Sequence, residues 1–157
     1  IVGKKKYMNF ADKSFLSSTA WTERVGFVAA NATINFFTKK KVYKHINLIG
    51  HQIKNGWLSL SKKYDIELTV SENNSLCSFF LNYKNNQELY TFFSKKMLEN
   101  NIIASNSIYV SYSHKKKDII KYLKICDHVF NKMSAFIKNK KKINKRNIRY
   151  SGFKRLT

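Results

Sequence analysis

Two hydroxyl residues, Ser18 and Thr19, stand just ahead of a predicted helix and are well suited by type and position to bind an anion. Hydroxyl and amide donors near a helix start suit a phosphate dianion, because free backbone N–H groups and the helix dipole favour negative charge there. The same residue types also cap helices or form the turn before them, and the local pattern alone favours this structural role. At the level of single residues, both roles stay open.

The histidines do not have the spacing of a metal site. His45 and His51 are six residues apart, so they do not share a helix face in the four-residue relation that a metal pair needs. His128 is expected to be exposed on the last predicted helix. His114 lies at a predicted strand-to-helix turn, where its ring would tie the turn to the helix start, and catalysis is the alternative role. We expect no bound metal.

The two cysteines, Cys77 and Cys126, are isolated and lie inside apolar patterns. Both are expected to be small core residues in a reducing compartment rather than parts of a disulfide framework. No apolar run approaches the roughly 18 residues of a membrane-spanning helix, and no secretory signal pattern is present. The expected location is therefore the cytoplasm, without a membrane partner.

The chain carries a net charge of +21, from 30 Lys and Arg against 9 Asp and Glu. A dense positive field attracts polyanions, so nucleic acids and anionic membrane surfaces are natural candidates as partners. Lys outnumbers Arg by 26 to 4, however, whereas phosphate-binding surfaces tend to use the bidentate Arg side chain. We therefore expect most of these lysines to lie on the solvent faces of helices.

Apolar spacing predicts four helices. The first runs from Thr22 to about Phe37, and two others are expected around residues 89–97 and 119–137. The longest, over residues 42–64, has about six turns by its length. Its apolar residues recur at intervals of three or four: Val42, Ile46, Ile49, Ile53, Trp57, Leu60 and Tyr64.

Short strands are predicted between these helices. Residues 66–70 alternate apolar and polar side chains, and residues 76–83 are aromatic and β-prone. Residues 102–104 and 108–112 are expected to give two short strands, or one strand and a bend. The order of elements predicts an α+β fold with a small, mostly antiparallel sheet covered by helices.

Residues 138–157 differ in composition from the rest of the chain. They contain nine Lys or Arg and no acid, with only scattered apolar residues. Such a segment cannot bury enough apolar surface to order itself, so we expect a disordered tail. One hypothesis is that this tail binds nucleic acid or an anionic surface. The alternatives are a disordered extension that reflects lysine-rich drift, and a terminus that packs on another part of a longer protein.

Three stretches resemble class III pyridoxal-phosphate aminotransferases, the group that contains glutamate-1-semialdehyde aminomutase. Residues 1–8 are similar to the short strand, Gly, basic residue and Met that follow the cofactor lysine in that family. Residues 15–34 match the segment in which a Ser/Gly-Thr step opens a long helix. Residues 87–133 contain the family's helix, its Ile-Ile-Ala strand and a Ser-x-Ser-His step at 111–114. The resemblance covers about residues 1–136 in the family's order.

The resemblance implies the C-terminal part of a fold type I transferase that uses pyridoxal 5'-phosphate (PLP). Residues 1–40 would be the end of the large cofactor domain, and 41–64 a long connecting helix. Residues 65–137 would form the whole small C-terminal α+β domain, followed by the tail at 138–157.

The same resemblance implies site residues. Thr19 would hydrogen-bond the cofactor phosphate of the partner subunit, with the Ser18 backbone beside it, in a homodimer formed through the large domain. The catalytic residues are unknown, because the cofactor lysine would lie upstream of Ile1, and this chain alone should be inactive. Glu23 and Arg24 would be either a solvated ion pair or groups that reach toward substrate.

The predicted function is transfer of an amino group to or from a small amino or keto substrate, as the C-terminal portion of an aminotransferase or aminomutase. Semialdehyde aminomutases carry a Glu-bearing loop before the His step, whereas residues 105–108 contain no acid here. Amino-sugar and amino-acid transaminases are therefore equally admissible. The alternative function is a non-catalytic basic α+β module that binds nucleic acid or another polyanion.

Overall fold

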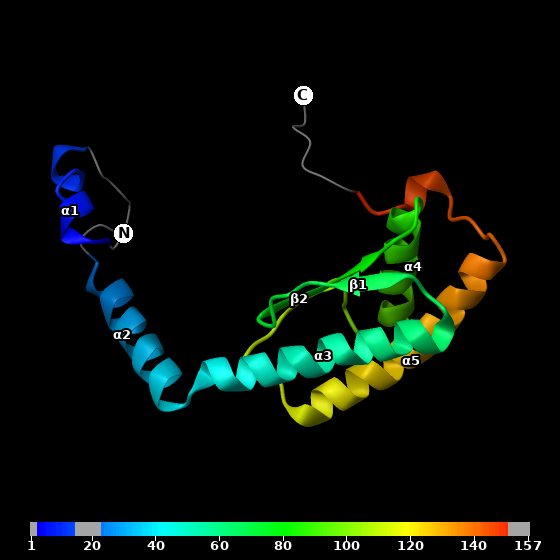
Figure 1. Ribbon diagram of the computed structural model, residues 1–157, viewed down its shortest axis with the longest axis horizontal. Helices are drawn as coiled ribbons and strands as arrows, with labels where there is room; N and C mark the ends of the chain where they lie inside the picture. Colours follow the sequence, from blue (N-terminus) through cyan, green and yellow to red (C-terminus); the bar gives the residue numbers. More distant parts are fainter. Residues whose placement is uncertain (1–2, 15–22, 151–157) are drawn as a thin grey trace. The chain divides into compact units, whose positions relative to one another are not determined.

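The computed structural model describes residues 3–14 and 23–150, and the chain divides into two units, Ile1–Lys40 and Lys41–Thr157. The first unit contains α1 (Lys5–Met8), the 3-10 turn η1 (Ala11–Lys13) and α2 (Arg24–Lys39) (Figure 1). The helix α2 confirms the helix predicted over residues 22–37. None of the residues of α2 is buried among the described residues.

The second unit holds the sheet and its covering helices. Its elements in chain order are α3 (Val42–Tyr64), β1 (Leu68–Val70), β2 (Leu76–Leu81), α4 (Asn86–Leu98), β3 (Ser107–Tyr109), α5 (Lys116–Lys138) and the 3-10 turn η2 (Lys145–Asn147). In Figure 1, α3 and α5 run beside each other below the sheet, and α4 lies at the right-hand end of the sheet.

The long helix α3 has the predicted bounds because its apolar stripe faces the rest of the unit. Ile49, Ile53 and Trp57 are buried on this stripe. The residues on either side of the helix, Lys41 and Asp65, have left-handed backbone conformations with φ of 50° and 54°. Each therefore turns the chain sharply, so α3 begins and ends where the sequence pattern does.

The three strands form an antiparallel sheet in the order β1-β2-β3. Leu68 pairs with Leu81 in the first ladder, and Cys77 pairs with Ile108 in the second. Side chains alternate along β2, so that Cys77, Phe79 and Leu81 point into the core. Both outer strands have three residues.

Aromatic rings from four elements meet in the core. Phe79 of β2 lies 5.0 Å from Trp57 of α3 and 5.1 Å from Phe93 of α4, measured between ring centroids. Phe130 of α5 lies 6.2 Å from both Phe79 and Phe93. The ring planes are steeply inclined, an arrangement that aromatic quadrupoles favour. These four residues join all three helices of the unit to one face of the sheet.

The prediction of an α+β fold with a small antiparallel sheet covered by helices is confirmed. Of the two alternatives predicted for residues 102–112, one strand and a bend is the one observed, because 102–104 form no strand, residue 106 is a bend and 107–109 pair with β2. Ile103 is 95% exposed, so this apolar residue faces solvent rather than a neighbouring strand.

The segment after α5 returns along α4. The Arg149 backbone N–H donates to Thr91 Oγ1 at 2.9 Å, and its guanidinium lies 4.3 Å from the centroid of the Tyr90 ring. The same guanidinium donates to Gln87 Oε1 at 3.0 Å and to Asn106 Oδ1 at 3.1 Å. Desolvation by these neighbours lowers the Arg149 pKa. In this part of the predicted tail, Arg149 is held by α4 and by the connection before β3.

Candidate functional site

The residues predicted to bind the cofactor phosphate, Ser18 and Thr19, fall within residues 15–22 and lie outside the described residues. The neighbouring Glu23 and Arg24 are described, and both are exposed at the start of α2. The ion pairs found in residues 3–14 and 23–150 join Lys63 to Asp127 and Lys96 to Glu99.

One lysine among the described residues of the second unit is buried. Lys54 of α3 is 8% exposed, and its ammonium donates to the carbonyl oxygens of Ser71 and Glu72 at 2.9 and 2.7 Å. These bonds hold the end of β1 against α3, so the ammonium is engaged in a structural role.

His114 occupies the predicted turn before α5, and hydrogen bonds fix it on two sides. Its Nδ1 accepts from the Ser111 backbone N–H at 3.1 Å, and its carbonyl oxygen accepts from His45 Nε2 at 2.9 Å. The ring therefore closes the turn on the Ser111 backbone ahead of it, whereas the sequence predicted a tie to the helix start. With Nδ1 acting as an acceptor, the neutral ring carries its proton on Nε2.

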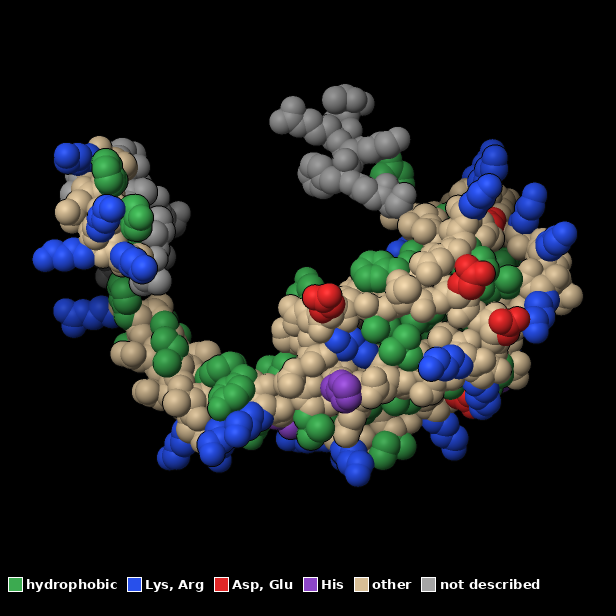
Figure 2. Space-filling model, viewed as in Figure 1, with side chains coloured by type: hydrophobic (Ala, Val, Ile, Leu, Met, Phe, Trp, Pro, Cys, Tyr) green, Lys and Arg blue, Asp and Glu red, His purple; other side chains and the backbone are tan. Residues whose placement is uncertain are grey.

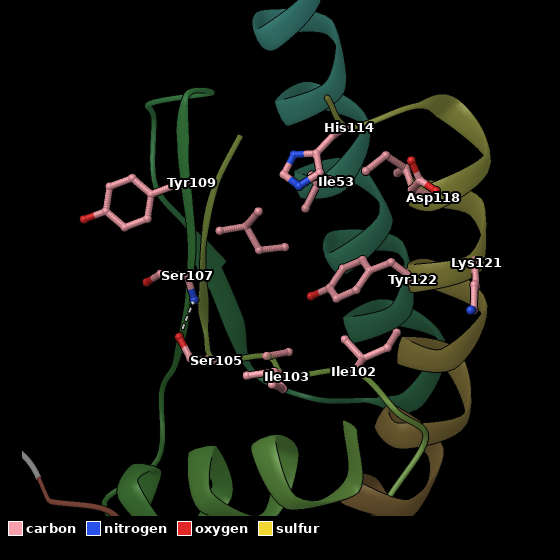
Figure 3. Close-up of a pocket in the computed structure, with 13 residues that line it drawn as sticks. Ile53, Ile102, Ile103, Ser105, Ser107, Tyr109, His114, Asp118, Lys121 and Tyr122 are labelled. Atoms are coloured by element: carbon pink, nitrogen blue, oxygen red, sulfur yellow. Dashed lines mark hydrogen bonds between the residues drawn. The ribbon is translucent and has the colours of Figure 1, made fainter. Parts of the chain in front are cut away.

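The His114 ring lies on the wall of a cavity of about 440 Å³. Figure 3 shows this cavity between α3, α5 and the connection that leads into β3, with the Tyr122 hydroxyl directed into the same space. Its apolar wall is formed by Ile53, Ile102, Ile103, Ala104, Ile108 and Ile119. Ser105, Ser107, Asp118 and Lys121 add polar groups. A mostly apolar cavity with a few polar groups is typical of a small-molecule site.

Tyr122 links this cavity to the core. The Trp57 indole N–H donates to the Tyr122 hydroxyl at 3.1 Å, and burial raises the pKa of that hydroxyl well above its ordinary value. Burial likewise raises the pKa of the nearby Cys126 thiol to about 12. Both groups stay protonated near neutral pH, so Cys126 is not a thiolate nucleophile. Burial also raises the pKa of Cys77, and both cysteines are core residues as predicted.

Lysines surround a second cavity, of about 330 Å³, at the end of α5. Its apolar part is formed by Phe136 and Ile137 of α5. Four of its lining residues are lysines, Lys84, Lys140, Lys141 and Lys142, and Glu88 lies among them. Figure 2 shows how far Lys and Arg (blue) exceed Asp and Glu (red) on the visible face of the molecule. This second cavity is a candidate site for an anion.

In residues 3–14 and 23–150, no three His, Cys, Asp or Glu side chains gather as metal ligands would. Within the same ranges, none of the helices has the length and apolar character needed to cross a membrane.

Sequence patterns did not identify either cavity. The first is built from Ile53 of α3 and from residues between Ile102 and Tyr122, which come from the connection before β3, from β3 itself and from α5, so α3 is far from the rest in the chain. The only residue of this cavity singled out from the sequence is His114, because of its place at a turn. Isoleucines at helical or strand spacing signal a core equally well, so no pattern marks those that line a cavity.

No family model and no curated protein matches this chain. Among solved structures, the chain is similar to the PLP internal aldimine form of the FumI protein of Sphingopyxis sp. MTA144, with a TM-score of 0.75 and 17% sequence identity. The similarity covers 88% of this chain and 33% of the FumI chain, so this chain spans about a third of the length of that protein. At this identity the likeness establishes the fold alone. The chain therefore shares its fold with part of a protein that carries PLP.

Proposed function

We propose that the chain is the C-terminal portion of a PLP-dependent class III aminotransferase or aminomutase, which moves an amino group to or from a small carbonyl substrate. The observation that carries the proposal is the fold similarity to the FumI protein over 88% of this chain. The resemblance of residues 1–136 to the aminotransferase family supports it independently. FumI itself is a protein with PLP bound as an internal aldimine.

In this proposal Thr19 and Ser18 hold the cofactor phosphate of the partner subunit. The Thr19 hydroxyl and the Ser18 backbone N–H would donate to the phosphate oxygens just ahead of α2, where a helix start favours an anion. PLP, when bound, supplies the electron sink for amino-group transfer, and the protein supplies placement. The partner is a second copy of the same protein, joined through the large domain.

Lys54 is not the cofactor lysine in this proposal, because its ammonium is engaged in the fold. Lys54 is the lysine that is buried among the described residues, and its ammonium already donates to two backbone carbonyls. The resemblance to the aminotransferase family implies that the cofactor lysine lies upstream of Ile1, and in this proposal residues 1–157 alone would not transaminate.

The test compares Thr19→Val with Thr19→Ser in the full-length protein. Valine has the shape of threonine but lacks the hydroxyl, so we expect PLP to bind about tenfold more weakly, whereas serine should keep affinity near wild type. PLP binding is followed by the absorbance of the bound cofactor, and the dimer by sedimentation. Equal PLP affinity in both variants, or a coding sequence upstream of Ile1 without a cofactor lysine, would refute the assignment.

A second candidate function, polyanion binding, is favoured by the lysine-lined cavity. Four lysines converge there beside Phe136 and Ile137, and the chain carries a net charge of +21. A phosphate backbone would release counterions on binding, so affinity should fall steeply with salt.

The discriminating experiment measures retention on duplex DNA as a function of salt. Lys141→Glu/Lys142→Glu changes two lysines of the cavity, and Lys95→Glu/Lys124→Glu makes the same charge change at exposed helix positions away from it. Selective loss of retention in the first variant supports a polyanion site. Absence of retention by the unchanged protein at low salt removes this function and leaves the PLP proposal untouched.

A further inference from the structure

We propose that the cavity beside His114 binds a small amphipathic carboxylate, with its apolar part against the isoleucines and its carboxylate on the His114 Nε2–H. This inference concerns a ligand site within residues 53–122 and does not depend on the PLP proposal. Its basis is the cavity's size, its apolar wall, the fixed orientation of one ring donor and the local excess of positive charge.

The size and wall of the cavity set the kind of ligand. About 440 Å³ is within the range of pockets that hold small organic molecules. Six of its lining residues, drawn from α3, α5, β3 and the connection before β3, are Ile or Ala. A hydrocarbon chain or ring placed there would remove this apolar surface from water, which is favourable in proportion to the area covered.

The His114 ring supplies a donor whose direction is already set. Its Nδ1 accepts from the Ser111 N–H at 3.1 Å, which orients the ring and leaves Nε2–H as the second ring group. Figure 3 shows the ring facing the cavity from above, with Ile53 behind it. Among the described residues, none bonds to Nε2. A donor held in place before the ligand arrives costs little ordering on binding.

Charge around the cavity favours an anion over a cation. Three consecutive lysines, residues 115–117, precede or begin α5, and Lys121 is among the lining residues although Figure 3 shows its ammonium directed away from the cavity. One carboxylate, Asp118, also lines it. One Asp118 oxygen already accepts from the Lys115 backbone N–H at 2.9 Å in the capping box of α5. The lysines outnumber this carboxylate, so a ligand carboxylate meets a net positive field.

The Ser105 hydroxyl completes the polar edge. Ser105 and Ser107 line the side of the cavity opposite α5, and the Ser107 backbone N–H donates to Ser105 Oγ at 3.2 Å (Figure 3). The Ser107 hydroxyl is paired with Ser78 across the sheet at 2.9 Å. The Ser105 hydroxyl keeps its proton free to donate to a polar group of the ligand.

The test is a calorimetric titration of the purified protein with octanoate as the probe, beside octylamine and octanol. These three molecules share a chain length and differ in the head group. We expect saturable binding of one octanoate per chain and at least about tenfold weaker binding of the amine and the alcohol. No saturable octanoate binding, or equal binding of all three, would overturn the proposal.

Two substitutions at His114 separate the donor from the turn. In His114→Asn the side-chain oxygen can still accept from the Ser111 N–H, but the group that donates into the cavity is removed. In His114→Gln the amide nitrogen takes the place of Nε2 and keeps a donor. We expect octanoate affinity to fall about tenfold in the Asn variant and to stay within about threefold in the Gln variant. Equal affinity of wild type and the Asn variant contradicts the site.

If substitution of His114 disrupts the turn, a second pair of variants, at Ile103, tests the site. Ile103 lines the cavity but is 95% exposed, so its substitution leaves the fold intact. Ile103→Asp adds a negative charge at the cavity mouth, and Ile103→Asn is the neutral control of the same shape. Octanoate should bind about threefold or more weakly to the Asp variant than to the Asn variant, and less so at high salt. Identical affinities would overturn the proposal.

Discussion

The hydrogen bond from the Trp57 indole N–H to the Tyr122 hydroxyl is a buried polar contact of the aromatic core. Trp57 is fully buried, and its N–H has Tyr122 as its partner at 3.1 Å. A buried donor that loses its acceptor costs more than the bond contributes when formed, because its desolvation is no longer offset.

Tyr122→Phe is therefore expected to lower the free energy of unfolding by about 1–3 kcal/mol, as measured by urea denaturation. The double variant Trp57→Phe/Tyr122→Phe removes donor and acceptor together. It should be destabilised by less than the sum of the two single changes. Strict additivity would show that the two groups do not act as a pair.

The buried thiol of Cys126 predicts how stability varies at alkaline pH. Its pKa rises from the ordinary 9.0 to about 12 because burial disfavours the thiolate. Between these values the folded chain keeps the proton that the unfolded chain releases, so stability is fully present below pH 9 and is lost as pH rises toward 12. The Cys126→Ala variant should show a shallower loss of thermal stability over this window. Equal slopes in the two proteins would argue against the raised pKa.

At the scale of elements, Gly50 and Gly56 of α3 are explained by close packing rather than by helix propensity. In sequence, Gly50 and Gly56 only weaken the helical pattern, since glycine costs about 1 kcal/mol relative to alanine. In the structure, a Cβ at Gly50 would overlap the Asn74 backbone, and a Cβ at Gly56 would meet the Leu123 side chain. The first neighbour is rigid and the second can change rotamer.

Gly50→Ala is accordingly expected to destabilise the protein by roughly 2 kcal/mol or more, despite its better helix propensity. Gly56→Ala should cost less, because Leu123 is able to move. The midpoint of urea unfolding distinguishes the two variants. If Gly50→Ala proved the more stable of the pair, the close approach of α3 to the β1–β2 turn would be wrong.

Helix bounds were the feature best predicted from sequence, because an apolar stripe of six turns is a strong signal. The observed α3, Val42–Tyr64, has the predicted limits. The sequence left open whether residues 102–104 form a strand of their own, since a short apolar run does not say whether a partner strand is within reach. The cavity beside His114 was not predictable, because its walls come from segments that meet only after folding.

At the scale of the whole molecule, the core formed by the described residues lies within the second unit. Its buried residues run from Ile49 to Phe136, whereas α2 has none among the described residues. Stability of the aromatic core should therefore not require residues 1–40.

A chain truncated to residues 41–157 is expected to unfold cooperatively, with a melting temperature within about 3 °C of that of residues 1–157. Circular dichroism at a helix wavelength follows the transition. The control is the chain of residues 1–157 measured in the same buffer. The buffer must be the same because the two chains differ in net charge, and salt screens that charge. A broad, non-cooperative melt of the shorter chain would show that the first unit contributes to folding of the second.

The three-residue lengths of β1 and β3 bear on how neighbouring molecules behave at high concentration. An outer strand offers its unpaired backbone groups to other chains, and long flat ones template intermolecular β-pairing. Here the edge strands β1 and β3 are each too short to pair stably with a strand of another molecule. Substitution of valine for the polar residues that flank β1 or β3 would lengthen the edge strand. We expect this change to promote aggregation and to leave the folded core unchanged.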